Sequence, residues 1–221
     1  MGGKDELSTY CIYIDNTLID TTAAVLHSLQ KAIREVTGEH WEISRLTPVL
    51  GIPGLNAFEM LGIRSPEQIF KIYPLWEQYM YSYQHTAYLY EGILPLLEYL
   101  KSQGHVLGII TSKTMVQYKN SFIPFGIGGM FRTVITADDT KQHKPHPAPM
   151  NTYMWLEDTD ASQVLYVGDS VYDMDCARAA GVDSALALWG CCHPDGIVST
   201  YRFASPESMT GWFRQGCPAP L

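Results

Sequence analysis

The stretch VLYVGDSVYDMDCARAAG, from Val164 to Gly181, carries the strongest fold signal in this chain of 221 residues. Its apolar start favours a buried strand, and the pattern after Gly168 is helical until Gly181, a residue suited to a left-handed helix end. Asp169 therefore lies where a strand passes into a helix, and Asp173 lies one helical turn further on. In an open parallel sheet, ligands bind beyond the carboxyl ends of the strands, where carboxylates can hold a hard cation. A single acid after a strand is often only a helix N-cap, so this interpretation needs support from the rest of the chain.

Strands and helices alternate along most of the chain. The strands expected from apolar runs are 9–14, 105–110, 131–136, 164–167, 185–189 and a short one near 202–203. This alternation predicts an α/β fold, a Rossmann-like, doubly wound parallel sheet with right-handed crossovers. Residues 20–86 break the alternation, because their pattern is helical throughout. We therefore expect a core domain formed by residues 1–19 and 87–221, and an inserted α-helical cap domain formed by residues 20–86.

The composition is typical of a soluble globular protein, with 46% hydrophobic and 17% charged residues. A net charge of −8 argues against nucleic acid as a partner, whereas a small anionic substrate is compatible with it, because a metal ion and lysines can reverse the field locally. Five cysteines without metal-ligand spacing indicate reduced thiols and a cytoplasmic protein. Met1–Leu7 has no apolar core, and no window is apolar enough to span a membrane, so we expect neither a signal peptide nor membrane association.

Polar side chains stand at several of the expected strand ends. They are Asp15, Thr17 and Asp20 after the first strand, Thr111 and Ser112 after the second, Lys144 before a helix, and Asp169 with Asp173. Gathered at one edge of the sheet, the acids would bind a divalent cation, the hydroxyls would bind phosphate oxygens, and the lysine would offset negative charge. Phosphoryl transfer needs this equipment, because it depends mostly on positioning and electrostatic stabilisation. Each residue alone has a plainer explanation, for example Asp15 as a turn residue or Lys144 as a solvated charge, but the set favours a site.

The order and spacing of these residues resemble the four motifs of the haloacid dehalogenase superfamily. The matching segments are Ile14–Asp20, Ile109–Lys113, Lys144–Pro147 and Gly168–Asp173. Together they extend over nearly the whole chain, and the helical insert resembles the small cap of the phosphoglycolate phosphatase and β-phosphoglucomutase branch. The resemblance implies a hydrolase, namely a magnesium-dependent phosphatase for a small phosphorylated metabolite of the phosphoglycolate or sugar phosphate class.

The resemblance also implies a role for each matching residue. Asp15 would be the catalytic acid and base, with Thr111 and Lys144 as further catalytic residues. The implied phosphate-binding residues are Thr17, Thr111, Ser112 and Lys144. The implied metal-binding residues are Asp15, Asp169 and Asp173. Asp15 would contribute its main-chain carbonyl, and Asp173 would hold either the metal-bound waters or Lys144.

The first motif departs from the family pattern, Asp-x-Asp-x-Thr, at its first position. Alignment through Thr17 places Asp15 at the second aspartate and Tyr13 where the family has its nucleophile. The shifted alignment, with Asp15 as nucleophile, would put Thr17 in place of the second acid and Ile19 in place of the threonine, so we disfavour it. A phenol has a reference pKa of about 10, and its phosphoryl ester is far more inert than an acyl phosphate. Loss of the carboxylate should also weaken the binding of Mg²⁺.

Three interpretations of Tyr13 stay open. The first is a phosphatase whose turnover is slow or absent. The second is a catalytically impaired protein on the same fold that binds a phosphorylated ligand or has a regulatory role. The third is an active enzyme into which Tyr13 was introduced as a change. A dehalogenase is disfavoured, because that reaction needs the missing nucleophile and has no use for the metal-binding acids.

Overall fold

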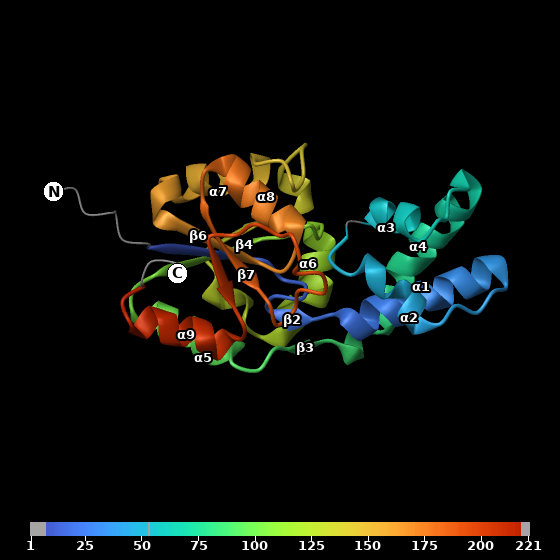
Figure 1. Ribbon diagram of the computed structural model, residues 1–221, viewed down its shortest axis with the longest axis horizontal. Helices are drawn as coiled ribbons and strands as arrows, with labels where there is room; N and C mark the ends of the chain where they lie inside the picture. The colour runs from blue at the N-terminus through green and yellow to red at the C-terminus, as the bar shows by residue number, and fades with distance from the viewer. Residues whose placement is uncertain (1–7, 53, 218–221) are drawn as a thin grey trace. The chain divides into compact units, whose positions relative to one another are not determined.

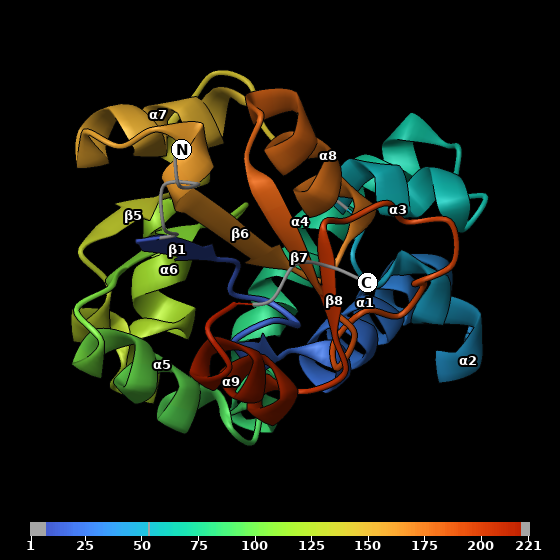
Figure 2. The same ribbon diagram turned by 60° about the vertical axis from the view of Figure 1, so that its left-hand side comes forward.

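A six-stranded parallel sheet forms the centre of the computed structural model, which describes residues 8–52 and 54–217. The strands are β1 (Thr9–Ile12), β4 (Val106–Ile110), β5 (Thr133–Ile135), β6 (Val164–Gly168), β7 (Asp183–Ala187) and β8 (Tyr201–Phe203). Their order is β5-β4-β1-β6-β7-β8, and every neighbouring pair is parallel (Figure 2). The chain starts in the middle of the sheet and winds outward to each edge in turn. The predicted α/β, Rossmann-like, doubly wound core is confirmed. The prediction about a signal peptide concerned Met1–Leu7, which lies outside the described residues.

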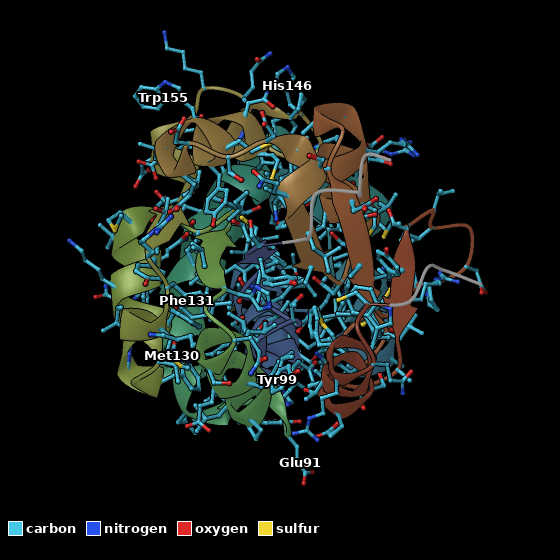
Figure 3. The ribbon with its side chains drawn as sticks, turned by 90° about the vertical axis from the view of Figure 1, so that its left-hand side faces the viewer. Glu91, Tyr99, Met130, Phe131, His146 and Trp155 are labelled. Atoms are coloured by element: carbon cyan, nitrogen blue, oxygen red, sulfur yellow. The ribbon has the colours of Figure 1, made fainter. Side chains whose placement is uncertain are left out.

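Helices cover both faces of this sheet (Figure 1). One face packs against α5 (Ile93–Ser102), α6 (Met115–Ser121) and α9 (Pro206–Arg214), and the other against α7 (Ala148–Glu157) and α8 (Val171–Ala180). Side chains alternate along β1, so that Tyr10 and Ile12 join the first hydrophobic cluster and Cys11 joins the second. Figure 3 shows the two sides, with Tyr99 on the side of α5 and Trp155 on the side of α7. Both faces are therefore buried, as a parallel sheet requires.

Strands β1 and β7 each end in a turn in which two or more amides donate to one carbonyl oxygen. The amides of Thr17, Leu18 and Ile19 all donate to the carbonyl oxygen of Ile14, so β1 ends at Ile12 although the apolar run continues to Ile14. At the same edge of the sheet, two amides donate to the carbonyl oxygen of Ala187, and β7 ends there. Because of these turns, the side chains that follow each strand stand at the carboxyl edge of the sheet.

The turn between β6 and α8 is closely packed. A Cβ atom on Gly168 would lie 2.5 Å from the Cβ atom of Asp173, so only glycine lets the first turn of α8 approach the strand end. Ser170 caps the helix, and its side chain and Asp173 exchange hydrogen bonds in a capping box. The helix ends at Gly181 in a left-handed conformation, as predicted. Since Ser170 is the N-cap, the Asp169 carboxylate is not used to cap the helix.

The chain between Asp20 and Tyr88 forms a second compact unit, separate from the unit that joins the chain up to Ile19 with the chain from Leu89 onward. Its helices are α1 (Thr22–Thr37), α2 (Ile43–Leu46), α3 (Gly54–Met60) and α4 (Pro66–Ser82). They enclose a hydrophobic core of their own that includes Leu29, Phe58 and Trp76. At its ends, β2 (Ile19–Asp20) pairs with β3 (Tyr88–Leu89) in a two-stranded sheet.

Short 3₁₀ turns complete the connections in both units. They are Thr47–Val49, Gln84–Thr86, Ile123–Phe125, Gly128–Met130, Ala137–Asp139 and Ala161–Gln163. Within the described ranges, none of the helices combines the length and the apolar character needed to cross a membrane.

Candidate active site

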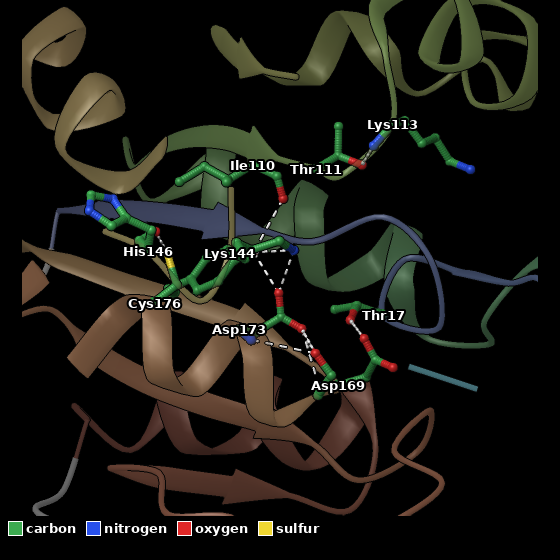
Figure 4. Close-up of polar contacts among 11 residues, drawn as sticks. Thr17, Ile110, Thr111, Lys113, Lys144, His146, Asp169, Asp173 and Cys176 are labelled. Atoms are coloured by element: carbon green, nitrogen blue, oxygen red, sulfur yellow. Dashed lines mark hydrogen bonds and ion pairs between the residues drawn. The ribbon is translucent and has the colours of Figure 1, made fainter. Parts of the chain in front are cut away.

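Adjacent strand ends bring most of the predicted site residues together. Strands β4, β1 and β6 are neighbours in the sheet. Residues 111–113 follow directly after β4, residues 13–17 after β1, and residues 169–173 after β6. Lys144 enters from the loop before α7 and reaches α8 (Figure 4). Asp20, in contrast, lies at the start of the second unit, where its carboxylate accepts hydrogen bonds from the amide of Thr22 and the hydroxyl of Tyr88.

Lys144 is held in a buried ion pair. Its Nζ lies 2.6 Å from Oδ1 of Asp173, and the two side chains are only 5% and 0% exposed. The same Nζ donates a hydrogen bond to the Tyr166 hydroxyl at 3.2 Å and lies 3.5 Å from the centre of the Tyr13 ring. A lysine ammonium has three N–H donors. Here they face a carboxylate, a phenol oxygen and an aromatic face, so the charge is compensated although water is largely excluded.

Both oxygens of Asp173 are engaged by the protein. Oδ1 accepts from Lys144 and from the Tyr166 hydroxyl, the latter at 2.9 Å. Oδ2 accepts from the hydroxyl of Ser170 at 2.6 Å and from its amide at 3.2 Å. Asp173 therefore contacts both Lys144 and the N-cap of α8.

Asp15 is paired with a lysine of the neighbouring strand end. Its Oδ1 lies 2.9 Å from Nζ of Lys113, and both side chains are mostly buried. The next residue, Asn16, adopts a left-handed backbone with φ of 53°. This is a conformation that asparagine tolerates better than most residues other than glycine. It lets the chain reverse directly after Asp15 and leaves the carboxylate at the edge of the sheet.

Asp169 is the least compensated acid of the site. Its side chain is buried, and the hydroxyl of Thr17 is 3.5 Å from its Oδ1, a long hydrogen bond. Burial, and next the charge of Asp173, raise the pKa of Asp169 well above its ordinary value, while Lys144 opposes this rise. A buried carboxylate with a raised pKa and weak partners is a group that a cation would stabilise.

The donor set fits magnesium only in part. The structure does not assemble Asp15, Asp169 and Asp173 into a metal-binding group, and among the described residues no three His, Cys, Asp or Glu side chains do so. The reason is that lysines hold two of these three carboxylates. Asp169 stays available, and the Asp15 main-chain carbonyl would be the second protein ligand. Mg²⁺ is often bound through one or two carboxylates together with waters and phosphate oxygens, so these residues fit a metal ion that arrives with a phosphorylated ligand.

Tyr13 occupies the position directly after β1. Its amide donates to the carbonyl oxygen of Val167 at 2.9 Å, and its ring is half-buried beside Lys144. Burial raises the pKa of Tyr13 well above its ordinary value, and the charges of Asp15, Asp173 and Asp169 act in the same direction, whereas a hydrogen bond with Ser112 opposes them. The phenol is therefore neutral at physiological pH and a poor nucleophile.

Thr111 and Ser112 complete the edge at the end of β4. Thr111 is buried, and its hydroxyl oxygen accepts from the amide of Lys113 at 3.2 Å, which leaves its O–H free to donate. Ser112 is exposed.

Sequence reasoning assigned no role to Lys113, Tyr166, Trp189 and Gly190, which all touch this site. Trp189 Nε1 donates to the carbonyl oxygen of Thr17 at 2.9 Å, across 172 residues of chain. A Cβ atom on Gly190 would lie 1.6 Å from the carbonyl oxygen of Asn16. The loop after β7 thus presses directly on the loop after β1. A tyrosine inside an otherwise apolar strand could have singled out Tyr166, but nothing in the sequence pattern indicates the contacts of Trp189 and Gly190.

The close approach at Gly190 leads to a stability prediction. Gly190→Ala should lower the free energy of unfolding by about 1–3 kcal/mol, because the new methyl group meets backbone that cannot move away. Gly129→Ala is the matched control, since a Cβ atom there meets no atom within 4 Å. The measurement is the midpoint of urea denaturation for both variants and the unchanged protein. Equal midpoints for Gly190→Ala and Gly129→Ala would show that the loop after β7 does not support the loop after β1.

Comparison with known proteins points to one family. The family model of the haloacid dehalogenase-like hydrolases matches residues 13–187, from Tyr13 to the end of β7. Pyrophosphatase PpaX of Bacillus velezensis is 27% identical over 176 residues, which are 80% of this chain and 81% of that protein. A solved structure from Lactobacillus plantarum, assigned as a phosphoglycolate phosphatase, has a TM-score of 0.85 at 26% identity and covers 93% of this chain and 99% of its own. A structure from Clostridium acetobutylicum, assigned as a phosphatase, has a TM-score of 0.83 at 19% identity and covers 95% of this chain and 100% of its own. At this identity the likeness shows the fold alone.

Proposed function

This chain belongs to the haloacid dehalogenase-like hydrolases, and we propose that it binds a small phosphorylated metabolite together with Mg²⁺ and hydrolyses the phosphate ester slowly. The observation that supports this is the assembly of Asp15, Thr111, Lys144 and Asp169 at three adjacent strand ends and the loop before α7. The relatives are described as a pyrophosphatase and a phosphoglycolate phosphatase. A substrate with a terminal phosphoryl group is the feature common to both. All five cysteines are free thiols, which supports a cytoplasmic location.

The proposed mechanism gives each residue one task. Lys144 and the Thr111 hydroxyl would bind oxygens of the phosphoryl group, and Asp173 would keep the lysine in place. Asp15 is the ion-pair partner of Lys113 in the resting state, so it would first take up a proton, then give it to the leaving oxygen, and regain one from the attacking water. When bound, Mg²⁺ would neutralise charge on the phosphoryl oxygens. Asp169 would hold the metal through its carboxylate.

Tyr13 accounts for the slow turnover in this proposal. In place of a carboxylate, the neutral phenol would have to lose its proton before it could attack phosphorus, and the raised pKa of Tyr13 opposes that loss. A phosphotyrosine, once formed, would also resist hydrolysis far more than an acyl phosphate. Both steps of a covalent route are therefore disfavoured.

A second candidate is a protein that binds the phosphorylated ligand and does not hydrolyse it. The neutral phenol of Tyr13 favours this alternative, because it leaves the end of β1 without a carboxylate nucleophile while Lys144 and Thr111 stay in place to bind phosphate. Such a protein would report the presence of the ligand. The two candidates share the binding site and differ only in the rate of the chemical step.

The binding experiment tests what both candidates share. We expect Mg²⁺ to bind at least about tenfold more tightly to the protein that already holds phosphate than to the free protein, a coupling within the usual range. By reciprocity, phosphate should bind more tightly by the same factor when Mg²⁺ is already bound. The physical reason is that, of Asp15, Asp169 and Asp173, Asp169 alone is not paired with a lysine, so the metal needs phosphate oxygens as further ligands. Calorimetric titration of each ion, with and without the other, measures this coupling.

Variants locate the coupling within the site. Asp169→Asn should abolish it, whereas Asp175→Asn, at a half-buried position of α8 where the carboxylate pairs with Arg178, should leave it unchanged. Tight binding of Mg²⁺ without phosphate would mean that the donor set is misassigned. If phosphate does not bind under either condition, the proposed function is wrong.

A further inference from the structure

Tyr166 carries the most connected buried hydroxyl of the site. The residue lies in β6 and is completely buried, with its ring in the hydrophobic cluster between the sheet and helices α7 and α8. Its oxygen accepts a hydrogen bond from Nζ of Lys144 at 3.2 Å and lies 2.9 Å from Oδ1 of Asp173 and 3.2 Å from the carbonyl oxygen of Ile110. The single O–H proton is directed at one of these last two acceptors.

The partners of this hydroxyl come from three different elements. Ile110 is the last residue of β4 and immediately precedes Thr111. Asp173 belongs to the first turn of α8, and Lys144 to the loop before α7. One oxygen atom therefore connects the strand end that carries the phosphate-binding threonine, the helix that carries the acid, and the lysine. Burial, followed by the charge of Asp173, raises the pKa of Tyr166 well above its ordinary value, so the hydroxyl keeps its proton.

We propose that Tyr166 is a positioning residue that fixes the Lys144 ammonium group for phosphate binding and does not itself touch the ligand. This inference rests on the proposed function, because it assigns Lys144 to the phosphoryl group. Without the Tyr166 hydroxyl, Lys144 would keep Asp173, the face of the Tyr13 ring and, at 5.9 Å, the ring of residue 166 as partners. The ammonium group could then rotate about its long side chain, and its average position would move away from the one that suits phosphate.

The chain offers a matched control at Tyr153. This tyrosine is also completely buried and belongs to the same hydrophobic cluster, on the same face of the sheet. Its hydroxyl lies beside the buried thiol of Cys11, away from the ion pair of the site. Tyr153→Phe and Tyr166→Phe therefore remove the same atom from equally buried rings, and only the second removes contacts to Lys144 and Asp173.

The first measurement is the affinity of each variant for inorganic phosphate in the presence of Mg²⁺, determined for protein shown by circular dichroism to be folded. We expect Tyr166→Phe to weaken phosphate binding by roughly tenfold, the usual consequence of losing one hydrogen bond to a charged group. Tyr153→Phe should leave the affinity unchanged. Equal affinities for the two variants would overturn the inference, because a purely structural role for Tyr166 predicts a change in melting temperature alone.

The second measurement does not depend on ligand binding. Acetic anhydride modifies the lysine amines of the folded protein, and mass spectrometry of proteolytic peptides, prepared after the reaction is quenched, reports the rate at each lysine. We expect Lys144 to react several-fold faster in Tyr166→Phe than in the unchanged protein or in Tyr153→Phe. Exposed Lys71 serves as the internal standard. An unchanged rate at Lys144 would refute the inference even if phosphate binds. If the rate rises but the unchanged protein binds no phosphate, then Tyr166 orders Lys144 and the proposed function itself has failed.

Discussion

Tyr13→Asp is expected to hydrolyse a generic phosphomonoester such as p-nitrophenyl phosphate at least about 10³-fold faster than the unchanged protein when Mg²⁺ is supplied. The substitution places a carboxylate at the end of β1, beside Lys144 and close to Asp169. It would supply a nucleophile that forms a labile acyl phosphate and a further ligand for the metal. It would also remove the ring that lies against the Lys144 ammonium group. Steady-state kinetics on both proteins under identical conditions measure the gain.

Two further variants separate the effect of the new carboxylate from the effect of removing the ring. Tyr13→Phe keeps the ring and loses only the hydroxyl, so it should be as inactive as the unchanged protein. Adding Asp15→Asn to Tyr13→Asp should remove most of the gained activity, because the proton donor is lost. Substantial hydrolysis by the unchanged protein and by Tyr13→Phe would show that a residue other than Tyr13 supplies the nucleophile.

Lys144→Met is expected to be the most destabilising single change at this site, at about 3–5 kcal/mol in the free energy of unfolding. Asp173 is fully buried, and without the lysine its charge would keep only hydrogen bonds from Tyr166 and Ser170. Urea denaturation followed by circular dichroism gives the size of the loss. The long apolar stem of methionine keeps most of the packing, so the effect reports mainly the lost charge.

An exposed ion pair provides the comparison. Lys71 and Glu67 form an ion pair at 2.7 Å on α4, with side chains 57% and 78% exposed. Lys71→Met should cost less than about 1 kcal/mol, because water screens such a pair. Combining Lys144→Met with Asp173→Asn should recover part of the stability, since the unpaired charge is then removed. Similar losses for Lys144→Met and Lys71→Met would contradict the view that burial makes the Lys144 pair important.

The sequence predicted the sheet, and it predicted polar residues at the strand ends, because both depend on local patterns. Apolar runs followed by polar residues mark strand ends, and parallel neighbours place those ends at one edge. The pattern could not decide between Asp169 and Ser170 as the cap of α8, since both residue types favour that position; the structure shows Ser170 in that role. It also gave no sign that Asp15 would pair with Lys113.

The remaining contacts depend on distant parts of the chain. Trp189 donates to the main chain at Thr17, and Gly190 leaves space for the main chain at Asn16, yet neither contact requires a particular residue type on the partner side. Contacts of this kind leave no periodic signal in a single sequence. The place of Lys144 against the Tyr13 ring is likewise a result of three-dimensional packing, although both residues were identified by their motif positions.

The pairing of β2 with β3 has a consequence for how this protein could be re-engineered. The chain leaves the first unit at Ile19–Asp20 and returns at Tyr88–Leu89, and these two segments pair as adjacent strands. The intervening segment is therefore an insertion whose two ends lie next to each other. Such an insertion can be exchanged for one of different length or shape without a change in the strand order of the six-stranded sheet. The inserted unit and the strand ends of the sheet can therefore be altered independently of each other.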